Sequence, residues 1–180
     1  MGIEMYLEGL DHYKEEMTAR RRDFHAHPET GWKEFRTTAK IIEALEGAGI
    51  PVKYGHEIIN RGYLWSYPTE EEIEAARKRA EEQGADPGIL EKMGTFTGAC
   101  AVIETGRPGP VVALRFDIDA NDVTESQSPD RQPVREHFCS MNPGAMHACG
   151  HDGHASMGIA VCQALNERKD QLKGTIKVIF

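Results

Sequence analysis

Two apolar segments and the helix expected between them set the tightest limit on how this chain can fold. The segment PVVALRFDI ends at residue 118, helical periodicity covers roughly 153–167, and a second apolar segment, GTIKVIF, follows. A strand, a helix and another strand in this order form a unit whose two strands run parallel in one sheet. The pattern therefore predicts an α/β protein.

The residues before this unit predict the rest of the sheet and its flanking helices. Apolar residues recur in steps of three and four from Ile3 to about Phe24, and again from Phe35 to Leu45, which indicates two amphipathic helices. The run FTGACAVIET is joined to PVVALRFDI by the turn GRPG, so we expect an antiparallel pair. PVVALRFDI is apolar at successive positions, as in a strand covered on both faces. The predicted fold class is α/β, a mixed sheet flanked by helices.

A strongly charged helix is expected between the early helices and the sheet. Thr69 and Glu72 have the spacing of a capping box, in which each side chain binds the backbone N–H of the other residue. The residues that follow, up to Gly84, are almost all charged, so this helix has little to bury. We interpret the region of about 60–93 as a charged helical insertion.

Composition argues against two classes of partner. The formal net charge of −8 repels nucleic-acid phosphates. No apolar run reaches the roughly 20 residues that a membrane helix needs, so neither nucleic acid nor a membrane is expected as a partner. The first residues lack the basic and apolar regions of a signal peptide, and the four cysteines are irregularly spaced. We therefore expect a cytoplasmic protein with free thiols.

The segment HACGHDGH holds the densest group of metal-competent side chains, namely His147, Cys149, His151, Asp152 and His154. Thiolate and imidazole groups suit zinc and similar divalent ions. An extended backbone would turn Cys149 and His151, which are two residues apart, to the same side. Two alternatives remain: histidines that cap a helix start, and a closed structural zinc site, for which no second pair of ligands is evident.

Two carboxylates at the end of PVVALRFDI form a second candidate group. Alternation along a strand sends Asp117 and Asp119 to the same side of the sheet, where one or both could orient a ligand or a metal-bound water. The alternative is that one of them caps the following loop. His25 and His27 stand at a helix end beside Pro28, and we interpret them as packing and turn residues without assigning a ligand there.

With these residues in view, the chain resembles the M20 family of metal-dependent amidohydrolases and peptidases, related to carboxypeptidase and hippurate hydrolase. The likeness is carried by RRDFHAHPETGWKEFRTTAKIIEALEGAGI, by TGRPGPVVALRFDIDA, and by PGAMHACGHDGH with the helix and GTIKVIF after it. The charged insertion and RQPVREHFCSMNPGAMHACGHDGH are similar to the branch of aminobenzoyl-glutamate hydrolase A subunits. The resemblance implies that residues 1–180 are the N-terminal part of a two-metal catalytic domain, without the family's lid and dimerisation domain.

The resemblance also implies roles for single residues. Cys149 and His151 match metal ligands of the family, and Asp119 looks like the carboxylate that supports the metal centre. Asp117 stands where other branches carry a ligating histidine. In the family, a general-base glutamate and a glutamate ligand follow the strand that ends here at Phe180. The 180 residues alone are therefore expected to have little or no activity.

For the complete enzyme, the resemblance implies two divalent metal ions, Mn²⁺ or Zn²⁺, and hydrolysis of the amide bond of an N-acyl or N-aroyl amino acid. Aminobenzoyl-glutamate is the favoured substrate. The implied partners are this small molecule and a second subunit, either an identical copy or a homologous chain. The alternative from another class is a non-catalytic metal-binding or subunit-interaction module.

Overall fold

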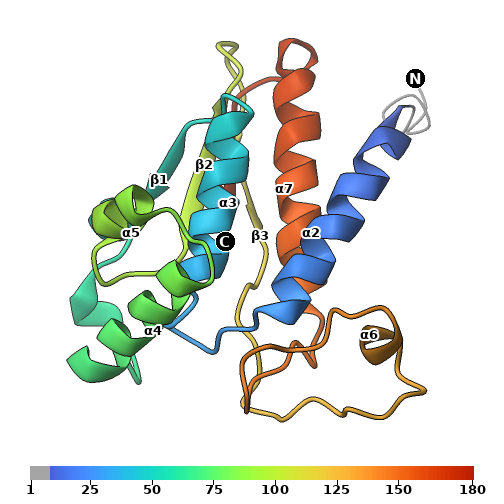
Figure 1. The fold of residues 1–180 in the computed structure, drawn as a ribbon. Helices are drawn as coiled ribbons and strands as arrows, with labels where there is room; N and C mark the ends of the chain where they lie inside the picture. Colours follow the sequence, from blue (N-terminus) through green and yellow to red (C-terminus); the bar gives the residue numbers. More distant parts are fainter. Residues whose placement is uncertain (1–8) are drawn as a thin grey trace.

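The computed structural model describes residues 9–180 and is built on a four-stranded mixed sheet (Figure 1). The strands lie in the order β1-β2-β4-β3. Strand β2 runs antiparallel to both of its neighbours, whereas β3 runs parallel to β4. The predicted α/β class with a mixed sheet is confirmed. The strands are β1 (Val52–Tyr54), β2 (Ala99–Glu104), β3 (Val111–Arg115) and β4 (Thr175–Ile179).

Helices α3 and α7 lie against one face of the sheet, and α2 packs beside α7 (Figure 1). The α-helices are α2 (Lys14–Ala26), α3 (Phe35–Gly47), α4 (Glu70–Glu82), α5 (Pro87–Met93), α6 (Gln132–Arg135) and α7 (His151–Glu167). Short 3-10 helices are η1 (Leu10–Tyr13), η2 (Gly55–Glu57), η3 (Arg61–Tyr63) and η4 (Lys169–Gln171). The expected start of the first helix, at Ile3, lies outside the described residues.

The expected antiparallel pairing of β2 with β3 is wrong, because β4 lies between them. The residue before β4 is hydrogen-bonded to the turn that joins β2 to β3: the Gly174 N–H donates to the Arg107 carbonyl at 2.8 Å. A Cβ on Gly174 would lie 2.0 Å from the Pro110 carbonyl oxygen, so only glycine fits this approach. The turn therefore spans a gap that is filled by the strand arriving from α7.

The expectation that β3 is covered on both faces is also wrong for the described part of the chain. Its first residues Val111 and Val112 are 65% and 45% exposed. Strand β3 stands at the edge of the sheet with β4 as its single neighbour there. Its apolar sequence is typical of a central strand, but among residues 9–180 no element covers its outer side.

The charged region forms α4 and α5, and its predicted start is confirmed. Thr69 accepts a hydrogen bond from the Glu72 N–H, and the Glu72 carboxylate accepts one from the Thr69 N–H. Helix α4 nevertheless buries one narrow stripe of Ile73, Ala76 and Ala80 and packs on α3. The charged residues thus cover the outer face of a helix that contributes to the core, and its status as an insertion stays a prediction.

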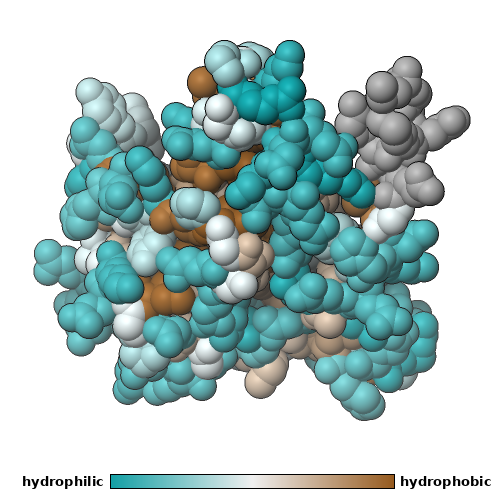
Figure 2. Space-filling model, turned by 90° about the horizontal axis from the view of Figure 1, so that it is seen from above, coloured by the Kyte–Doolittle hydropathy of each residue, from teal (hydrophilic) through white to brown (hydrophobic). Residues whose placement is uncertain are grey.

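The face of the molecule that is seen from above in Figure 2 is mainly hydrophilic. Viewed from above, hydrophilic residues dominate, and hydrophobic ones come through in the middle of the view (Figure 2). Within residues 9–180, none of the helices has the length and apolarity that a membrane crossing requires.

Candidate metal centre

Backbone hydrogen bonds bring the residues after β3 against the segment before α7. The Ala120 N–H donates to the Glu29 carbonyl at 2.7 Å, which holds this stretch against the connection between α2 and α3. Asn121 and Met146 exchange two backbone hydrogen bonds of 2.9 and 3.0 Å, and the Asn121 side-chain oxygen accepts from the Cys149 N–H at 3.2 Å. The two motifs noted in the sequence, DIDA and HACGHDGH, therefore meet in space.

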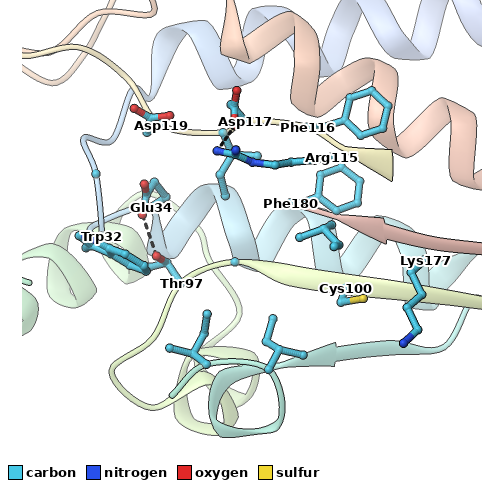
Figure 3. Close-up of a pocket in the computed structure, with 16 residues that line it drawn as sticks. Trp32, Glu34, Thr97, Cys100, Arg115, Phe116, Asp117, Asp119, Lys177 and Phe180 are labelled. Atoms are coloured by element: carbon cyan, nitrogen blue, oxygen red, sulfur yellow. Dashed lines mark hydrogen bonds and ion pairs between the residues drawn. The ribbon is translucent and has the colours of Figure 1, made fainter. Parts of the chain in front are cut away.

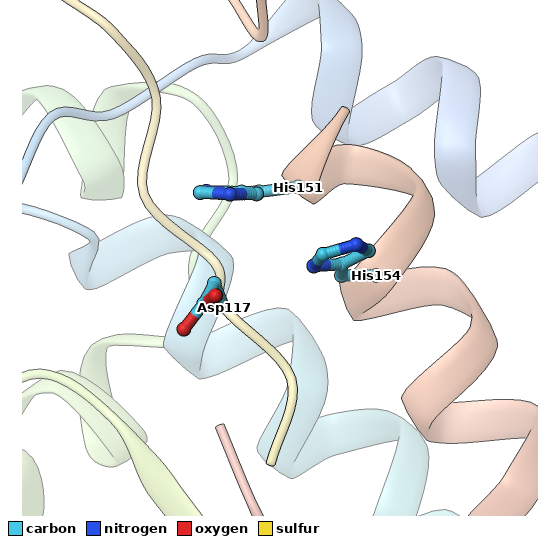
Figure 4. Close-up of side chains that lie close together, drawn as sticks. All are labelled: Asp117, His151 and His154. Atoms are coloured by element: carbon cyan, nitrogen blue, oxygen red, sulfur yellow. The ribbon is translucent and has the colours of Figure 1, made fainter. Parts of the chain in front are cut away.

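Asp117, His151 and His154 form a group that we call the open cluster (Figure 4). One ligand atom from each residue lies within 4.8 Å of the others, and all three side chains are partly buried. His151 and His154 project from the first turn of α7, three residues apart on one helix face. Asp117 also pairs with Arg115 at 2.6 Å. Imidazole and carboxylate groups at this separation suit a divalent metal ion.

His151 is held in one orientation by Asp119. Its Nδ1 lies 3.0 Å from the Asp119 carboxylate oxygen Oδ1 and 3.0 Å from the Asp119 backbone carbonyl oxygen. Both oxygens can only accept, so Nδ1 carries the hydrogen and Nε2 of the neutral ring keeps its lone pair. Metal-binding histidines commonly show this arrangement, in which a carboxylate fixes the tautomer and turns the other nitrogen toward the ion. The donor set therefore fits a metal.

Cys149 is exposed and does not belong to the open cluster. The extended backbone expected between Cys149 and His151 is wrong, since Gly150 has φ 85° and ψ 22° and His151 is the first residue of α7. The inference that alternation turns both side chains to one side therefore does not hold. The ligand roles of Cys149 and His151 and the supporting role of Asp119 stay predictions.

A second group next to α7, the filled cluster, consists of His25, Asp152 and Glu125. The His25 ring lies between the two carboxylates, with Nδ1 2.8 Å from Asp152 and Nε2 3.0 Å from Glu125. All three side chains are at least 96% buried, being 4%, 1% and 3% exposed. Arg21 also contacts Asp152 at 2.8 Å, and the Ser140 N–H donates to Glu125 at 2.5 Å.

The filled cluster is a set of satisfied charges. Burial opposes protonation of His25, but its hydrogen bonds with Asp152 and Glu125 outweigh burial and raise its pKa. Burial likewise opposes ionisation of Asp152, yet the hydrogen bond with His25 and the charge of Arg21 lower the pKa of that carboxyl. His25 therefore ties α2 to α7 and to the loop before α6, and its contacts are with carboxylates rather than with the open cluster.

His147 differs from His25 because nothing satisfies it. It is 5% exposed, and neither ring nitrogen has a hydrogen-bond partner in the described part of the chain. Burial lowers its pKa to about 4 despite the opposing charge of Asp152, so the ring is neutral near pH 7. Leaving a buried polar group unpaired costs about 1–3 kcal/mol, which favours the binding of a group that can pair with it.

A cleft of about 590 Å³ opens beside the end of β3, and Asp117, Asp119 and Glu34 are among its lining residues (Figure 3). Burial raises the pKa of Glu34 to about 7, and its carboxyl accepts a hydrogen bond from the Thr97 hydroxyl at 2.7 Å. A carboxyl that titrates near neutrality in a cleft is a candidate for proton transfer. Sequence reasoning missed Glu34, whose single signal is its place in a stretch that carries the family resemblance.

Comparison with known proteins shows which family the second half of the chain is similar to. The profile of the peptidase family M20/M25/M40 matches residues 113–180, which run from β3 through the open cluster to β4. This part of the chain is therefore similar to the peptidases of that family. The recognition made from HACGHDGH and its neighbouring segments is thereby confirmed.

The proteins that are similar to this chain include two hydrolases. The chain is 44% identical over 166 residues to the indole-3-acetyl-aspartic acid hydrolase of Enterobacter agglomerans, covering 92% of this chain and 38% of that protein. It is 43% identical over 161 residues to a p-aminobenzoyl-glutamate hydrolase subunit of Escherichia coli strain K12, covering 89% and 37%. The chain thus spans well under half the length of these relatives.

Two solved structures share the fold. An aminobenzoyl-glutamate utilization protein from Klebsiella pneumoniae superposes with a TM-score of 0.78 at 37% identity, over 97% of this chain and 38% of that one. A dinuclear metal-binding peptidase of the M20 family from Bacillus subtilis superposes with a TM-score of 0.64 at 30% identity, over 94% and 35%. The sheet and helices described above are therefore those of M20 peptidase domains.

Proposed function

We propose that the whole protein containing this chain is a metal-dependent amidohydrolase that cleaves an N-acyl or N-aroyl amino acid, with aminobenzoyl-glutamate as the favoured substrate. Both similar hydrolases are named for an aromatic acyl group joined to an acidic amino acid. The products would be a carboxylic acid and a free amino acid. Because the chain spans 38% and 37% of those relatives, the activity is proposed for the whole protein.

The observation that carries the proposal is the pairing of Asp119 with His151, a member of the open cluster. It leaves one imidazole nitrogen available to a metal, with Asp117 and His154 offering further ligand atoms within 4.8 Å. We propose that Cys149 and His151 contribute ligands to a site for two divalent ions, Mn²⁺ or Zn²⁺. Similarity to a dinuclear metal-binding peptidase supports that number. When bound, such ions polarise a scissile carbonyl and lower the pKa of bound water.

The protein's own residues orient the His151 ring and provide a carboxyl that can transfer a proton. Asp119 fixes the hydrogen on His151 Nδ1, and Gly150 adopts the left-handed conformation from which α7 begins. Glu34 lines the cleft with a pKa of about 7, so near neutral pH it can hold or release a proton. The same protein is proposed to act with a partner chain, identical or homologous, because one relative is named as one subunit of a hydrolase.

The test is hydrolysis of p-aminobenzoyl-glutamate and of hippurate by the whole protein, with Mn²⁺ or Zn²⁺ and after chelation. We expect metal-dependent cleavage with a preference for p-aminobenzoyl-glutamate. Asp119→Asn should lower metal affinity about 10–100-fold, since carboxylates that hydrogen-bond a metal-binding histidine have effects of that size. His12→Ala is the control for metal affinity, because His12 is exposed on η1.

Three results would count against this proposal. Equal rates on the two compounds would reject the favoured substrate, and metal binding without turnover of either compound would support a non-catalytic module instead. Light scattering on the same preparation should show a mass above that of a single chain, and a monomer in the active preparation would reject the proposed partner chain.

A further inference from the structure

A second cleft, the arginine groove, lies beside the segment that leads into α7. Its volume is about 590 Å³. Arg131 and Arg135 line it from α6 and the residue before it, Arg21 lines it from α2, and Cys149 and Gly150 line it next to the open cluster. Gly150 immediately precedes His151, so the groove begins one residue, about 3.8 Å along the backbone, from the candidate metal centre.

The arginine groove carries an excess of positive charge. Of the three guanidinium groups that line it, Arg21 is paired with Asp152 at 2.8 Å, so the excess comes from Arg131 and Arg135. The one carboxylate among its lining residues, Asp130, accepts a hydrogen bond from the Ser128 hydroxyl. Arg135 donates to the Asp130 backbone carbonyl, whereas the Arg131 side chain donates no hydrogen bond within the described part of the chain. An arginine fork binds a carboxylate through two parallel hydrogen bonds, so this groove is suited to an organic anion.

Two independent features add to this preference. Gly150 is the N-cap of α7, a helix of 17 residues with no side-chain cap at its N-terminus, where the helix dipole places a partial positive charge. The buried His147 ring also lines the groove with neither nitrogen paired. An imidazole ring carries at least one N–H in either protonation state, and an anion in the groove would give that buried donor its missing partner.

We propose that the arginine groove binds the side-chain carboxylate of the acidic amino acid in the substrate. This inference rests on the proposed function and names the part of the substrate that the enzyme selects. In an acyl-glutamate, four bonds separate the amide nitrogen from the side-chain carboxyl carbon, about 5 Å when extended. That reach matches a groove that starts beside the candidate metal centre, and Arg131 and Arg135 set the preference for an acidic residue.

The experiment measures kcat/KM of the whole protein on three compounds. These are p-aminobenzoyl-glutamate, the corresponding glutamine compound without the side-chain charge, and the isoglutamine compound without the α-carboxylate charge. We expect kcat/KM to be at least tenfold higher on the glutamate compound than on the glutamine compound, because the loss of one hydrogen bond to a charged group has an effect of this size. Arg131→Gln and the double variant Arg131→Gln/Arg135→Gln should reduce that preference at least tenfold, with the rate on the glutamine compound nearly unchanged.

Arg107→Gln is the matched control, because Arg107 lies in the turn between β2 and β3 and donates to the Asp170 carbonyl. Equal losses on the glutamate and glutamine compounds in the Arg131 variant would overturn the inference. The inference would also be overturned if the arginine substitutions lowered kcat/KM on the glutamate compound but not on the isoglutamine compound. The groove would then bind the α-carboxylate, whose charge the isoglutamine compound lacks. If the unmodified protein with metal cleaves none of the three, the proposed function fails and the inference with it, a result distinct from either of the other two.

Discussion

The filled cluster and the open cluster lie on neighbouring residues of α7 and differ in how their polar atoms are satisfied. In the filled cluster, His25 has a carboxylate at each ring nitrogen, at 2.8 and 3.0 Å, and all its members are buried. In the open cluster, His151 has one nitrogen paired with Asp119, and one potential ligand atom from each of its three residues lies within 4.8 Å of the others.

The difference separates a structural group of charges from a site that can take a ligand. A buried charge is tolerated when it is paired and hydrogen-bonded, and a fully paired cluster has no atoms left to bind anything else. Side chains that converge with free lone pairs are instead prepared for a ligand, and His147 beside them is buried with none of its nitrogens paired. Histidine and carboxylate side chains therefore serve two purposes in this region. Of two adjacent residues, His151 belongs to the open cluster and Asp152 to the filled cluster.

The largest expected effect comes from breaking the filled cluster. His25→Ala leaves two buried carboxylates without their shared cation, and removing one partner of such a group costs about 3–5 kcal/mol in free energy of unfolding. Urea denaturation gives this value directly. His27→Ala is the control, because the His27 ring is less buried and hydrogen-bonds to the backbone carbonyl of Asp23, a loss of about 1 kcal/mol. Equal losses of free energy of unfolding in the two variants would mean that His25 contributes no more than a single hydrogen bond, and that the filled cluster is not a set of paired charges.

The next effect concerns the open cluster, which should gain stability from a ligand. Mn²⁺ at about 100 times its Kd should add about 2.7 kcal/mol to the free energy of unfolding, because the ion binds the folded state. His151→Ala should lose most of this gain and His154→Ala part of it, while His12→Ala keeps it. Unfolding of each variant with and without Mn²⁺ measures the gain. An undiminished gain in His151→Ala would show that the ion binds elsewhere.

Local patterns predicted the elements of this fold but not their neighbours in the sheet. Periodicity located α2, α3, α7 and the strands β2, β3 and β4, but β1 and α6 were not predicted. The capping box of Thr69 is set by residues three positions apart. The place of β4 between β2 and β3 depends on the close approach of Gly174 to Pro110, which joins residues far apart in the sequence. No periodic pattern relates these positions, so the pairing could not be inferred.

The candidate site shows the same limit. The chemistry of HACGHDGH was evident from residue types, whereas the direction of each side chain depends on the left-handed conformation of Gly150 and on where α7 begins. The partners of His25 are 127 and 100 residues away, so its place between two carboxylates had no local signal. Residue chemistry thus indicated a candidate metal site, and tertiary structure decided which groups converge there.

The smallest expected effect is a pH dependence confined to the filled cluster. The pKa of His25 is raised in the folded state, so its stabilising contribution is complete below the unfolded pKa of about 6.5 and is lost as pH rises through the folded value. The charged or titratable groups around it are Asp152, Glu125, Arg21 and His147.

The measurement is the difference in free energy of unfolding between the unmodified chain and His25→Gln, followed from pH 5.5 to pH 9. Groups common to both proteins largely cancel, and glutamine is neutral throughout, so the difference should decrease with rising pH. The decrease should be smaller than the full loss in His25→Ala, because a neutral imidazole still fills its space and keeps one hydrogen bond. A difference that stays constant would mean that folding leaves the pKa of His25 unchanged, and a difference that increases with pH would mean that folding lowers it.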